Sequence, residues 1–424
     1  MKFRTLFLIL AAFFAIRLFI ASTTPVFDTS EARYAAISAN MARTGDFLVP
    51  RFTYRDVYQS FDGKPPLLFQ LSGLACRTFG VNEFAVRLPV LLATLALLVL
   101  MGLTVRRAAD TPRALLAAGI CLSSTAYYAL AGFCMPDGLL TPCIAAAYCC
   151  HFLYLVSGNR NWTLGVFAAL GIGMVVKGPV ALALFAVPVF LDTCFNHRWH
   201  FIHAYRWFTG LALFLALAAP WFILMTRQNP GFLTYFFINE NLLRFLVHDY
   251  GDKYGAGRET FRGMALVWLF VVTLPWPLFF APHVRRLKGL KIRRVLHALF
   301  IGSDTALFAW GIAGIVGFWC LTSRVPLAYV MPAVPLFAML VALKAPADTL
   351  RKYLPAAALI SIVALVGTLA VVHTTSNKML GADAPYRRGR YSYEFYHGTP
   401  ILPQGRPTPS NGTTTPISDT PTHP

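Results

Sequence analysis

The chain has 424 residues, of which 57% are hydrophobic and only 13% are charged, and its mean hydropathy is +0.57. This composition excludes an ordinary soluble domain and indicates a protein made mostly of membrane spans. The net charge of +19 does not indicate a nucleic-acid partner, because the basic residues flank apolar runs, where the anionic headgroups of membrane lipids account for them.

The sequence predicts an all-α, polytopic integral membrane protein with about eleven transmembrane helices, because apolar runs of roughly 18 or more residues, the length that crosses a bilayer, recur along the chain. Lys2 and Arg4 precede the first run and no small-residue cleavage site follows it, so we expect a retained span with a cytoplasmic N-terminus. The predicted spans lie near residues 5–22, 84–104, 114–133, 139–156, 162–176, 179–195, 207–225, 263–283, 299–321, 327–343 and 354–372.

The loops between these spans alternate in charge. Loops on the predicted cytoplasmic side are short and rich in Lys and Arg, as the positive-inside rule requires. Outer loops mix acids and bases, and two of them are long, so we expect the chemistry on that face. The cytoplasmic basic residues are Arg106, Arg107, Arg113, Arg160, Arg198, Arg206, Arg285, Arg286, Lys288, Lys291, Arg293, Arg294, Lys344, Arg351 and Lys352.

In the first outer loop, residues 29–44 have large apolar positions at helical spacing, which predicts a short amphipathic helix lying on the membrane surface. Asp28 and Glu31 at its start have two interpretations. They form a capping pair at the helix N-terminus, or they are positioned carboxylates of the kind that a general base requires. Arg33 and Tyr34 follow on the same helix as candidate binding residues.

More charged residues lie at the predicted outer ends of later spans. Lys64 precedes two prolines and a short apolar stretch. It is either a lysine that snorkels to the interface or a point charge for a lipid phosphate. Asp137 and Lys177 place an anion and a cation in two successive outer turns. The later outer segments add Glu240, Arg244, Arg324 and Tyr329 to this set.

The cysteines and histidines give no sign of a metal site. The eight cysteines fall almost entirely inside apolar runs, so packing explains them better than a disulfide framework. No CxxC spacing or His/Cys cluster indicates zinc, and no Gly-rich loop follows a strand. We therefore assign no metal ligand from the residues.

Taken in order, the outer-face motifs resemble those of GT-C type membrane glycosyltransferases. The likeness is to the bacterial branch of the protein O-mannosyltransferase family that includes the lipid A 4-amino-4-deoxy-L-arabinose transferase, and it covers roughly residues 1–345. The ordered series is more specific than any single motif. It consists of Asp28-x-x-Glu31-x-Arg33-Tyr34-Ala35, Gly45-Asp46-x-x-Val49-Pro50, Lys64-Pro65-Pro66, Phe84-Ala85-Val86-Arg87-Leu88-Pro89, Asp137, Lys177-Gly178-Pro179, Glu240-Asn241-x-x-Arg244-Phe245 and Ser323-Arg324 to Pro332.

The resemblance implies a polyprenyl-phosphate sugar donor, a lipid or glycan acceptor and a reaction at the outer face of a bacterial inner membrane. It implies that Asp28 and Asp137 are the essential acids, with Glu31 as a third catalytic candidate, and that Lys64 and the later outer cations hold phosphate. Gly63 stands where the lipid A transferase has an acidic residue before its lysine. A divalent metal ion therefore stays an open alternative and no cofactor is assigned.

The predicted function is transfer of a sugar from a polyprenyl-phosphate donor to a lipid of the lipid A or lipopolysaccharide type, or to another cell-envelope acceptor. Protein O-mannosylation is the alternative within the family, and a lipid or sugar transporter or flippase is the alternative from another class. A transporter predicts ionisable residues near the middle of its spans. Here only Arg17 lies well inside a predicted span, which favours a transferase.

The composition changes near the C-terminal end. We expect residues 1–374 to form the transmembrane glycosyltransferase domain and residues 375–424 to form a disordered tail rich in Pro, Ser and Thr. Such a composition predicts that the tail buries no core. The tail should then be dispensable for activity.

Overall fold

The computed structural model describes residues 3–27, 30–54, 57–247, 254, 259–285, 292–380 and 391–398. Its elements are α1 (Phe3–Thr23), α2 (Ser30–Thr44), β1 (Arg51–Tyr54), β2 (Val57–Ser60), α3 (Leu67–Phe79), α4 (Glu83–Ala108), α5 (Thr111–Leu122), α6 (Thr125–Leu130), α7 (Pro136–Ser157), α8 (Asn161–Lys177), α9 (Val180–Phe195), α10 (Trp199–His203), α11 (Trp207–Gln228), the π-helix η1 (Thr234–Leu243), α12 (Arg244–Leu246), α13 (Met264–Thr273), α14 (Trp276–Arg285), α15 (Ile292–Phe300), α16 (Ala306–Cys320), the 3-10 helix η2 (Leu327–Val330), α17 (Ala333–Lys344), α18 (Ala347–Leu380) and α19 (Tyr391–His397).

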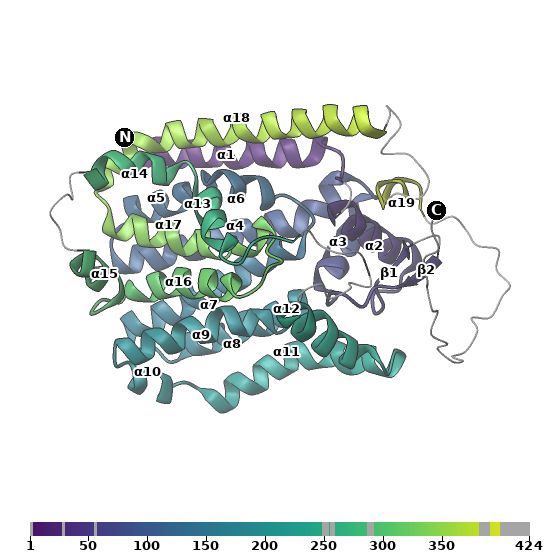
Figure 1. The fold of residues 1–424 in the computed structure, drawn as a ribbon, viewed down its shortest axis with the longest axis horizontal. Helices are drawn as coiled ribbons and strands as arrows, with labels where there is room; N and C mark the ends of the chain where they lie inside the picture. Colours follow the sequence, from purple (N-terminus) through teal and green to yellow (C-terminus); the bar gives the residue numbers. More distant parts are fainter. Residues whose placement is uncertain are drawn as a thin grey trace, which may run out of the picture.

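The all-α prediction is confirmed. Among the described residues the strands are β1 and β2, which form one antiparallel hairpin with Phe52 opposite Gln59. Long helices run side by side along the long axis of the molecule (Figure 1). The segments α10, α14 and α15 lie at the end where the chain begins, whereas α2, α3 and α19 lie toward the opposite end. The segments predicted on the two sides of a membrane therefore separate to opposite ends of the structure.

Within the part of the chain that the structure describes, five helices are long and apolar enough to cross a membrane, namely α1, α4, α7, α11 and α18. Together α13 and α14 make a sixth such span if they are counted as one across their 86° bend. Five more apolar helices, α5, α8, α9, α16 and α17, have only 10–17 residues. The chain is thus a multi-pass membrane protein, but the count of about eleven spans is not confirmed, because the short helices fall below the length of a full crossing.

The predicted span 114–133 shows why some apolar runs give short helices. It is divided between α5 and α6 at Ser123 and Ser124. The hydroxyl of Ser123 donates to the carbonyl of Gly119 at 2.5 Å, and that of Ser124 donates to Ile120 at 2.8 Å. Such bonds compete with the backbone ladder and end the helix inside an apolar run.

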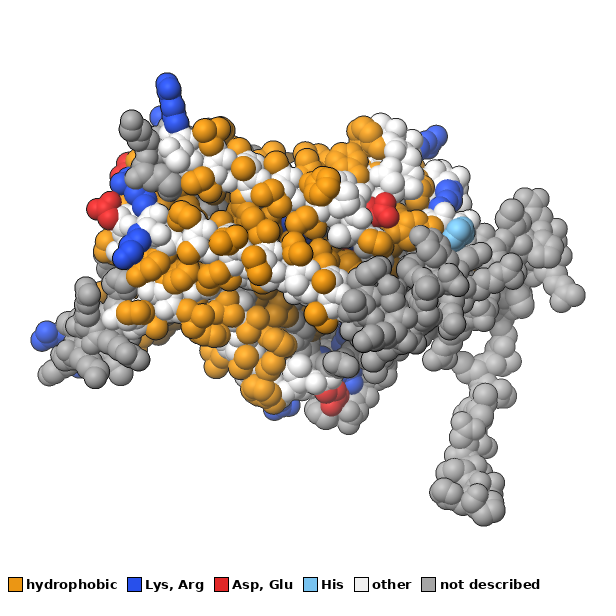
Figure 2. All heavy atoms as spheres, turned by 90° about the horizontal axis from the view of Figure 1, so that it is seen from above, with side chains coloured by type: hydrophobic (Ala, Val, Ile, Leu, Met, Phe, Trp, Pro, Cys, Tyr) orange, Lys and Arg blue, Asp and Glu red, His pale blue; other side chains and the backbone are white. Residues whose placement is uncertain are grey.

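The surface of the molecule is apolar around its middle. Figure 2 shows hydrophobic side chains covering the centre of the visible face, with most charged side chains toward the two ends. Leu359 and Val363 of α18 are each 61% exposed. In the interior, small residues let helices approach closely. A Cβ on Gly311 of α16 would lie 2.6 Å from Leu336 and 3.0 Å from Tyr148, so a larger side chain there would require its neighbours to shift.

The first outer loop contains the helix expected over residues 29–44, which is α2, and a second short helix, α3, in the apolar stretch after Lys64. However, α2 is buried on nearly all sides and does not lie on a membrane surface, since Ala32, Ala35, Ala36 and Ala39 are all 0% exposed. Small side chains allow α3 to pack against it, and a Cβ on Gly73 would lie 2.9 Å from a backbone oxygen of α2. The apolar spacing of this helix therefore reflects packing within the loop.

Part of the segment after residue 374 has packed structure. Helix α18 continues to Leu380, and α19 packs against α2 with Phe395 fully buried and Glu394 4% exposed. The prediction that residues 375–424 bury no core is wrong for residues 391–398. The cause is a local aromatic sequence, Tyr-Ser-Tyr-Glu-Phe-Tyr-His, within an otherwise polar region. Residues 381–390 and 399–424 lie outside the described residues.

Candidate active site

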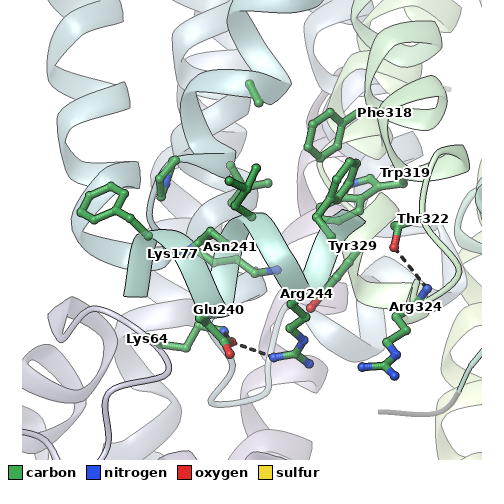
Figure 3. A pocket seen from close by; sticks show the side chains of 16 residues that line it. Lys64, Lys177, Glu240, Asn241, Arg244, Phe318, Trp319, Thr322, Arg324 and Tyr329 are labelled. Atoms are coloured by element: carbon green, nitrogen blue, oxygen red, sulfur yellow. Dashed lines mark hydrogen bonds and ion pairs between the residues drawn. The ribbon is translucent and has the colours of Figure 1, made fainter. Parts of the chain in front are cut away.

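A cavity of about 430 Å³ lies at the end of the helix bundle that carries the first loop. Its lining comes from the start of α9, from η1 and α12, from the end of α16 and from η2. Phe318 and Trp319 form an aromatic wall on one side, and charged side chains lie along the opposite edge (Figure 3). The predicted site residues that line the cavity are Lys64, Lys177, Glu240, Arg244, Arg324 and Tyr329.

Glu240 joins two of the cations. Its Oε1 accepts from Lys64 Nζ, which comes from the first loop, and from Arg244 Nη1 at 2.7 Å, one helical turn along the chain. The Glu240 side chain is 5% exposed and that of Lys64 is 14% exposed. Lys64 also donates to the carbonyl of Gly63 at 2.7 Å. A carboxylate therefore occupies, in this structure, the place between two cations where another anion could bind.

Lys177 and Asp137 form a second pair. The Nζ atom of Lys177 donates to Asp137 Oδ1, and both side chains are less than a tenth exposed. The same Nζ lies 3.8 Å from the centre of the Tyr329 ring, which is a close cation–π contact. Asp137 does not line the cavity itself but holds the lysine that does.

Arg324 supplies the fourth cation. Its guanidinium donates to Glu259 at 3.2 Å, and its backbone N–H donates to the Thr322 hydroxyl at 3.5 Å. Its side chain is 9% exposed and that of Glu259 is 38% exposed, so a partly solvated carboxylate faces a largely buried cation. All four cations of the cavity thus have carboxylate partners before any ligand is bound.

The turn after Lys177 determines how closely η1 approaches. Gly178 has a φ of +93°, and a Cβ there would lie 2.6 Å from the ring of Phe236 in η1. Only glycine satisfies both conditions. In η1 the Asn241 amide donates to the carbonyl of Phe236 at 2.6 Å, and Glu240 faces the cavity. The Lys-Gly-Pro motif thus provides both a cation and the space that brings Glu240 near it.

Glu31 lies elsewhere. Its carboxylate is 3% exposed and accepts from Arg87 of α4 through two parallel bonds, Nε to Oε1 at 2.7 Å and Nη2 to Oε2 at 2.8 Å. It also accepts from the backbone N–H of Phe27 at 3.1 Å and of Cys134 at 3.0 Å. The bond from the Phe27 N–H to the Glu31 carboxylate resembles the predicted helix cap. With four donors and no place in the cavity lining, Glu31 has the environment of a structural residue.

Arg33 and Tyr34 also lie outside the cavity lining. The guanidinium of Arg33 donates to the carbonyl of Tyr254 at 3.3 Å and lies 5.6 Å from the ring centre of Phe61. Tyr34 is 8% exposed and packs against Phe61 and Phe69. Both residues therefore belong to the packed core of the first loop. Asp28 lies outside the described residues.

Sequence reasoning missed several residues around the cavity. Phe318 and Trp319 were assigned only to a span, although aromatic residues at the outer end of a span are typical of lipid interfaces. Thr322 and Glu259 gave no signal, because their role depends on contact with Arg324. Within the described residues, no group of three or more His, Cys, Asp or Glu side chains could hold a metal ion. The cavity's carboxylate, Glu240, already has two cationic partners.

Comparison with known proteins shows what this chain is similar to. The sequence model of the dolichyl-phosphate-mannose-protein mannosyltransferases matches residues 63–224. A protein of Erwinia tasmaniensis named undecaprenyl phosphate-alpha-4-amino-4-deoxy-L-arabinose arabinosyl transferase is 28% identical over 385 residues, covering 88% of this chain and 66% of that protein. A protein of the same name from Aeromonas hydrophila is 29% identical, covering 76% of this chain and 56% of that protein. This chain thus spans between about half and two thirds of the length of these relatives.

A solved structure has the same fold. It is described as ArnT from Cupriavidus metallidurans bound to undecaprenyl phosphate, and it superposes with a TM-score of 0.68 over 94% of this chain and 76% of that one. The two sequences are 20% identical, so this likeness bears on the fold. Residues 63–224 therefore match the model of the dolichyl-phosphate-mannose-protein mannosyltransferases, and the resemblance to GT-C type membrane glycosyltransferases that the motifs indicated is confirmed.

Proposed function

We propose that this protein is a glycosyltransferase that moves a sugar from a polyprenyl-phosphate donor to a lipid of the lipid A type, or to another cell-envelope acceptor. The observation that carries the proposal is the two-sided cavity, with Lys64, Lys177, Arg244 and Arg324 along one edge and an aromatic wall opposite. A polyprenyl phosphate has the same division, with an anionic head and an apolar chain. The names of the relatives and the ligand of the solved structure support this reading.

The reaction needs little acid catalysis on the donor side. The acceptor oxygen attacks the anomeric carbon, the bond from that carbon to the phosphate oxygen breaks, and the lipid phosphate leaves with the electron pair. Cations fixed at the edge of the cavity stabilise that developing charge. Donor phosphate would take the place of Glu240 between Lys64 and Arg244. Asp28 is the proposed base that accepts the proton of the acceptor.

Replacement of Lys64 with methionine tests the phosphate site. It keeps the apolar stem, and it should weaken binding of polyprenyl phosphate by roughly 10- to 100-fold, the value of one charged hydrogen bond. Binding is measured on purified protein in detergent. Arg51→Met is the matched control, because Arg51 lies in the same loop and pairs with Asp46 outside the cavity. Equal affinity in the Lys64 variant and the control would contradict the proposal.

Asp28→Asn tests the proposed base. Asn removes the charge but caps a helix as well as Asp does, so the variant should insert normally and lose most transfer activity. Single-turnover transfer with donor already bound separates chemistry from binding. If Asp28 were only a helix cap, this variant would transfer at the normal rate.

Assays with different acceptors separate the remaining alternatives. Transfer to a lipid acceptor in reconstituted membranes supports the proposal, and transfer to a protein hydroxyl would instead make the chain a protein mannosyltransferase. A transporter or flippase would move labelled donor lipid between leaflets without forming a new glycosidic bond. Arg17 does not favour transport, because it is 2% exposed and donates to the carbonyls of Tyr128 and Ala129 at 2.7 Å.

We propose that the protein lies in a bacterial inner membrane with its cavity facing outward and its N-terminus in the cytoplasm. The basic loops at the opposite end support this orientation. A cysteine at Thr78, which is exposed near the end of α3 in the first loop, should react with a membrane-impermeant thiol reagent in intact cells. A cysteine at Asn159, exposed at the other end, should react only after the membrane is opened. The reverse pattern would place the cavity in the cytoplasm.

A further inference from the structure

Helix α19 is attached to the first outer loop, although the two are far apart in the sequence. The Glu394 side chain accepts from Asn40 Nδ2 of α2 at 2.6 Å, across 354 positions of the chain. Its two oxygens also accept from the backbone N–H of Thr53 in β1, each at 3.1 Å. Burial raises the pKa of Glu394, while these donors act in the opposite direction. A buried carboxyl group thus joins the loop's helix to its hairpin.

Further bonds hold the C-terminal half of α19. Arg43 of α2 donates to the carbonyl of Glu394 at 3.1 Å and to that of Phe395 at 2.6 Å, and so satisfies the C-terminal end of the helix. The hydroxyl of Tyr396 donates to Glu83 at 2.7 Å and accepts from the backbone N–H of Val26 at 3.2 Å. Val26 lies just before the first loop. The helix therefore contacts the loop at its entry and in its middle.

A continuous series of contacts leads from β1 to the cavity. Phe52, next to Thr53, is fully buried and its ring centre lies 5.4 Å from that of Phe61. The ring centre of Tyr391 in α19 also lies 5.9 Å from that of Phe52. A Cβ on Gly63 would lie 3.0 Å from the ring of Phe61, so the backbone just before Lys64 rests on that ring.

Tyr254 supports the same backbone from the other direction. Its hydroxyl accepts from the N–H of Asp62 at 2.9 Å and donates to the carbonyl of Ser60 at 3.2 Å. Its ring centre lies 4.8 Å from that of Phe61. The chain from Ser60 to Gly63 is therefore held by hydrogen bonds and by rings, and Lys64 extends from it into the cavity.

We propose that α19 is a positioning element for the phosphate site, with Glu394 as its principal positioning residue, acting on Lys64 through Thr53, Phe52 and Phe61. This inference rests on the proposed role of Lys64 as a contact for donor phosphate. Glu394 does not touch the cavity. Its effect comes from fixing the hairpin that supports the backbone before Lys64.

A double-mutant cycle tests this inference, because two residues that act through one contact have non-additive effects. The variants are Glu394→Ala, Lys64→Met and the pair together, with binding of polyprenyl phosphate as the measurement. We expect Glu394→Ala to weaken binding by roughly tenfold or more, since small misplacements of a binding group are costly. The double variant should bind no more weakly than Lys64→Met alone. Val57→Ala, 58% exposed on the same hairpin, is the control and should bind normally.

The outcomes distinguish this inference from the proposed function. If Lys64→Met binds normally, the phosphate site itself is wrong. If Lys64→Met is weak but Glu394→Ala binds normally, or if the two losses add, the positioning role is overturned. Glu394→Gln, which keeps one acceptor oxygen for Thr53, serves if the alanine variant does not fold. Its affinity for polyprenyl phosphate should lie between those of the parent and of Glu394→Ala. Where it replaces the alanine variant in the cycle, its effect should be non-additive with that of Lys64→Met. Normal binding by this folded variant would also contradict the positioning role.

Discussion

Replacing Asp137 with asparagine should lower the rate of sugar transfer by about 100- to 1,000-fold, because Asp137 holds Lys177 and the loss of one cationic contact to a transition state usually costs that much. Asp137 is the carboxylate partner of Lys177, and both side chains are less than a tenth exposed. Without that carboxylate, a largely buried ammonium loses its counter-charge, so it should move toward water and away from its place in the cavity. The rate is measured with saturating donor in reconstituted membranes.

The separate effects of the Asp137 variant on kcat and on KM show what Asp137 does. A fall in kcat at unchanged KM for the donor means that the pair acts in the transition state. A rise in KM with unchanged kcat means that Asp137 only keeps Lys177 in place for binding. Asp348→Asn is the control, because Asp348 is 96% exposed and pairs with Arg351 at the opposite end. Normal kcat and KM in the Asp137 variant would remove Asp137 from the mechanism.

Replacing Arg87 with methionine should destabilise the protein by about 3–5 kcal/mol, because it leaves the buried Glu31 carboxylate without its cation. The Arg87 side chain is 0% exposed. Besides Glu31, it donates to the carbonyls of Ala21, Thr24 and Pro25 at 2.6–3.0 Å. One side chain therefore connects α4, the end of α1 and the start of α2. Unfolding in detergent, followed with temperature or denaturant, measures the change.

The double variant Glu31→Gln/Arg87→Met should recover part of this loss, since no uncompensated charge stays buried. Arg106→Met, an exposed position at the other end of α4, should leave stability unchanged. If Glu31→Gln kept normal stability and abolished transfer, Glu31 would be a catalytic acid after all. If Arg87→Met were as stable as the parent, the pair would not contribute to the fold.

The sequence alone determined the class of fold and the charged residues of the cavity. Helices occupy every predicted apolar run, because a bilayer forces the backbone to satisfy its hydrogen bonds within each segment. The charges at the outer ends of the spans predicted Lys64, Lys177 and Arg324, and these residues do meet in one cavity. Charges placed between apolar runs can lie only at the two ends of a bundle, so a search among a few outer loops was enough to find them.

Only the tertiary structure separated residues of similar appearance within those loops. Glu31 and Glu240 are both buried glutamates near basic residues, but one lies between α2 and α4 and the other lines the cavity. The polar composition around residues 391–398 predicted no packing, whereas Glu394 joins Asn40 and Thr53. Local composition and spacing describe neighbours along the chain. Contacts across hundreds of residues depend on which helix faces pack together, and that information appears only when the chain is folded.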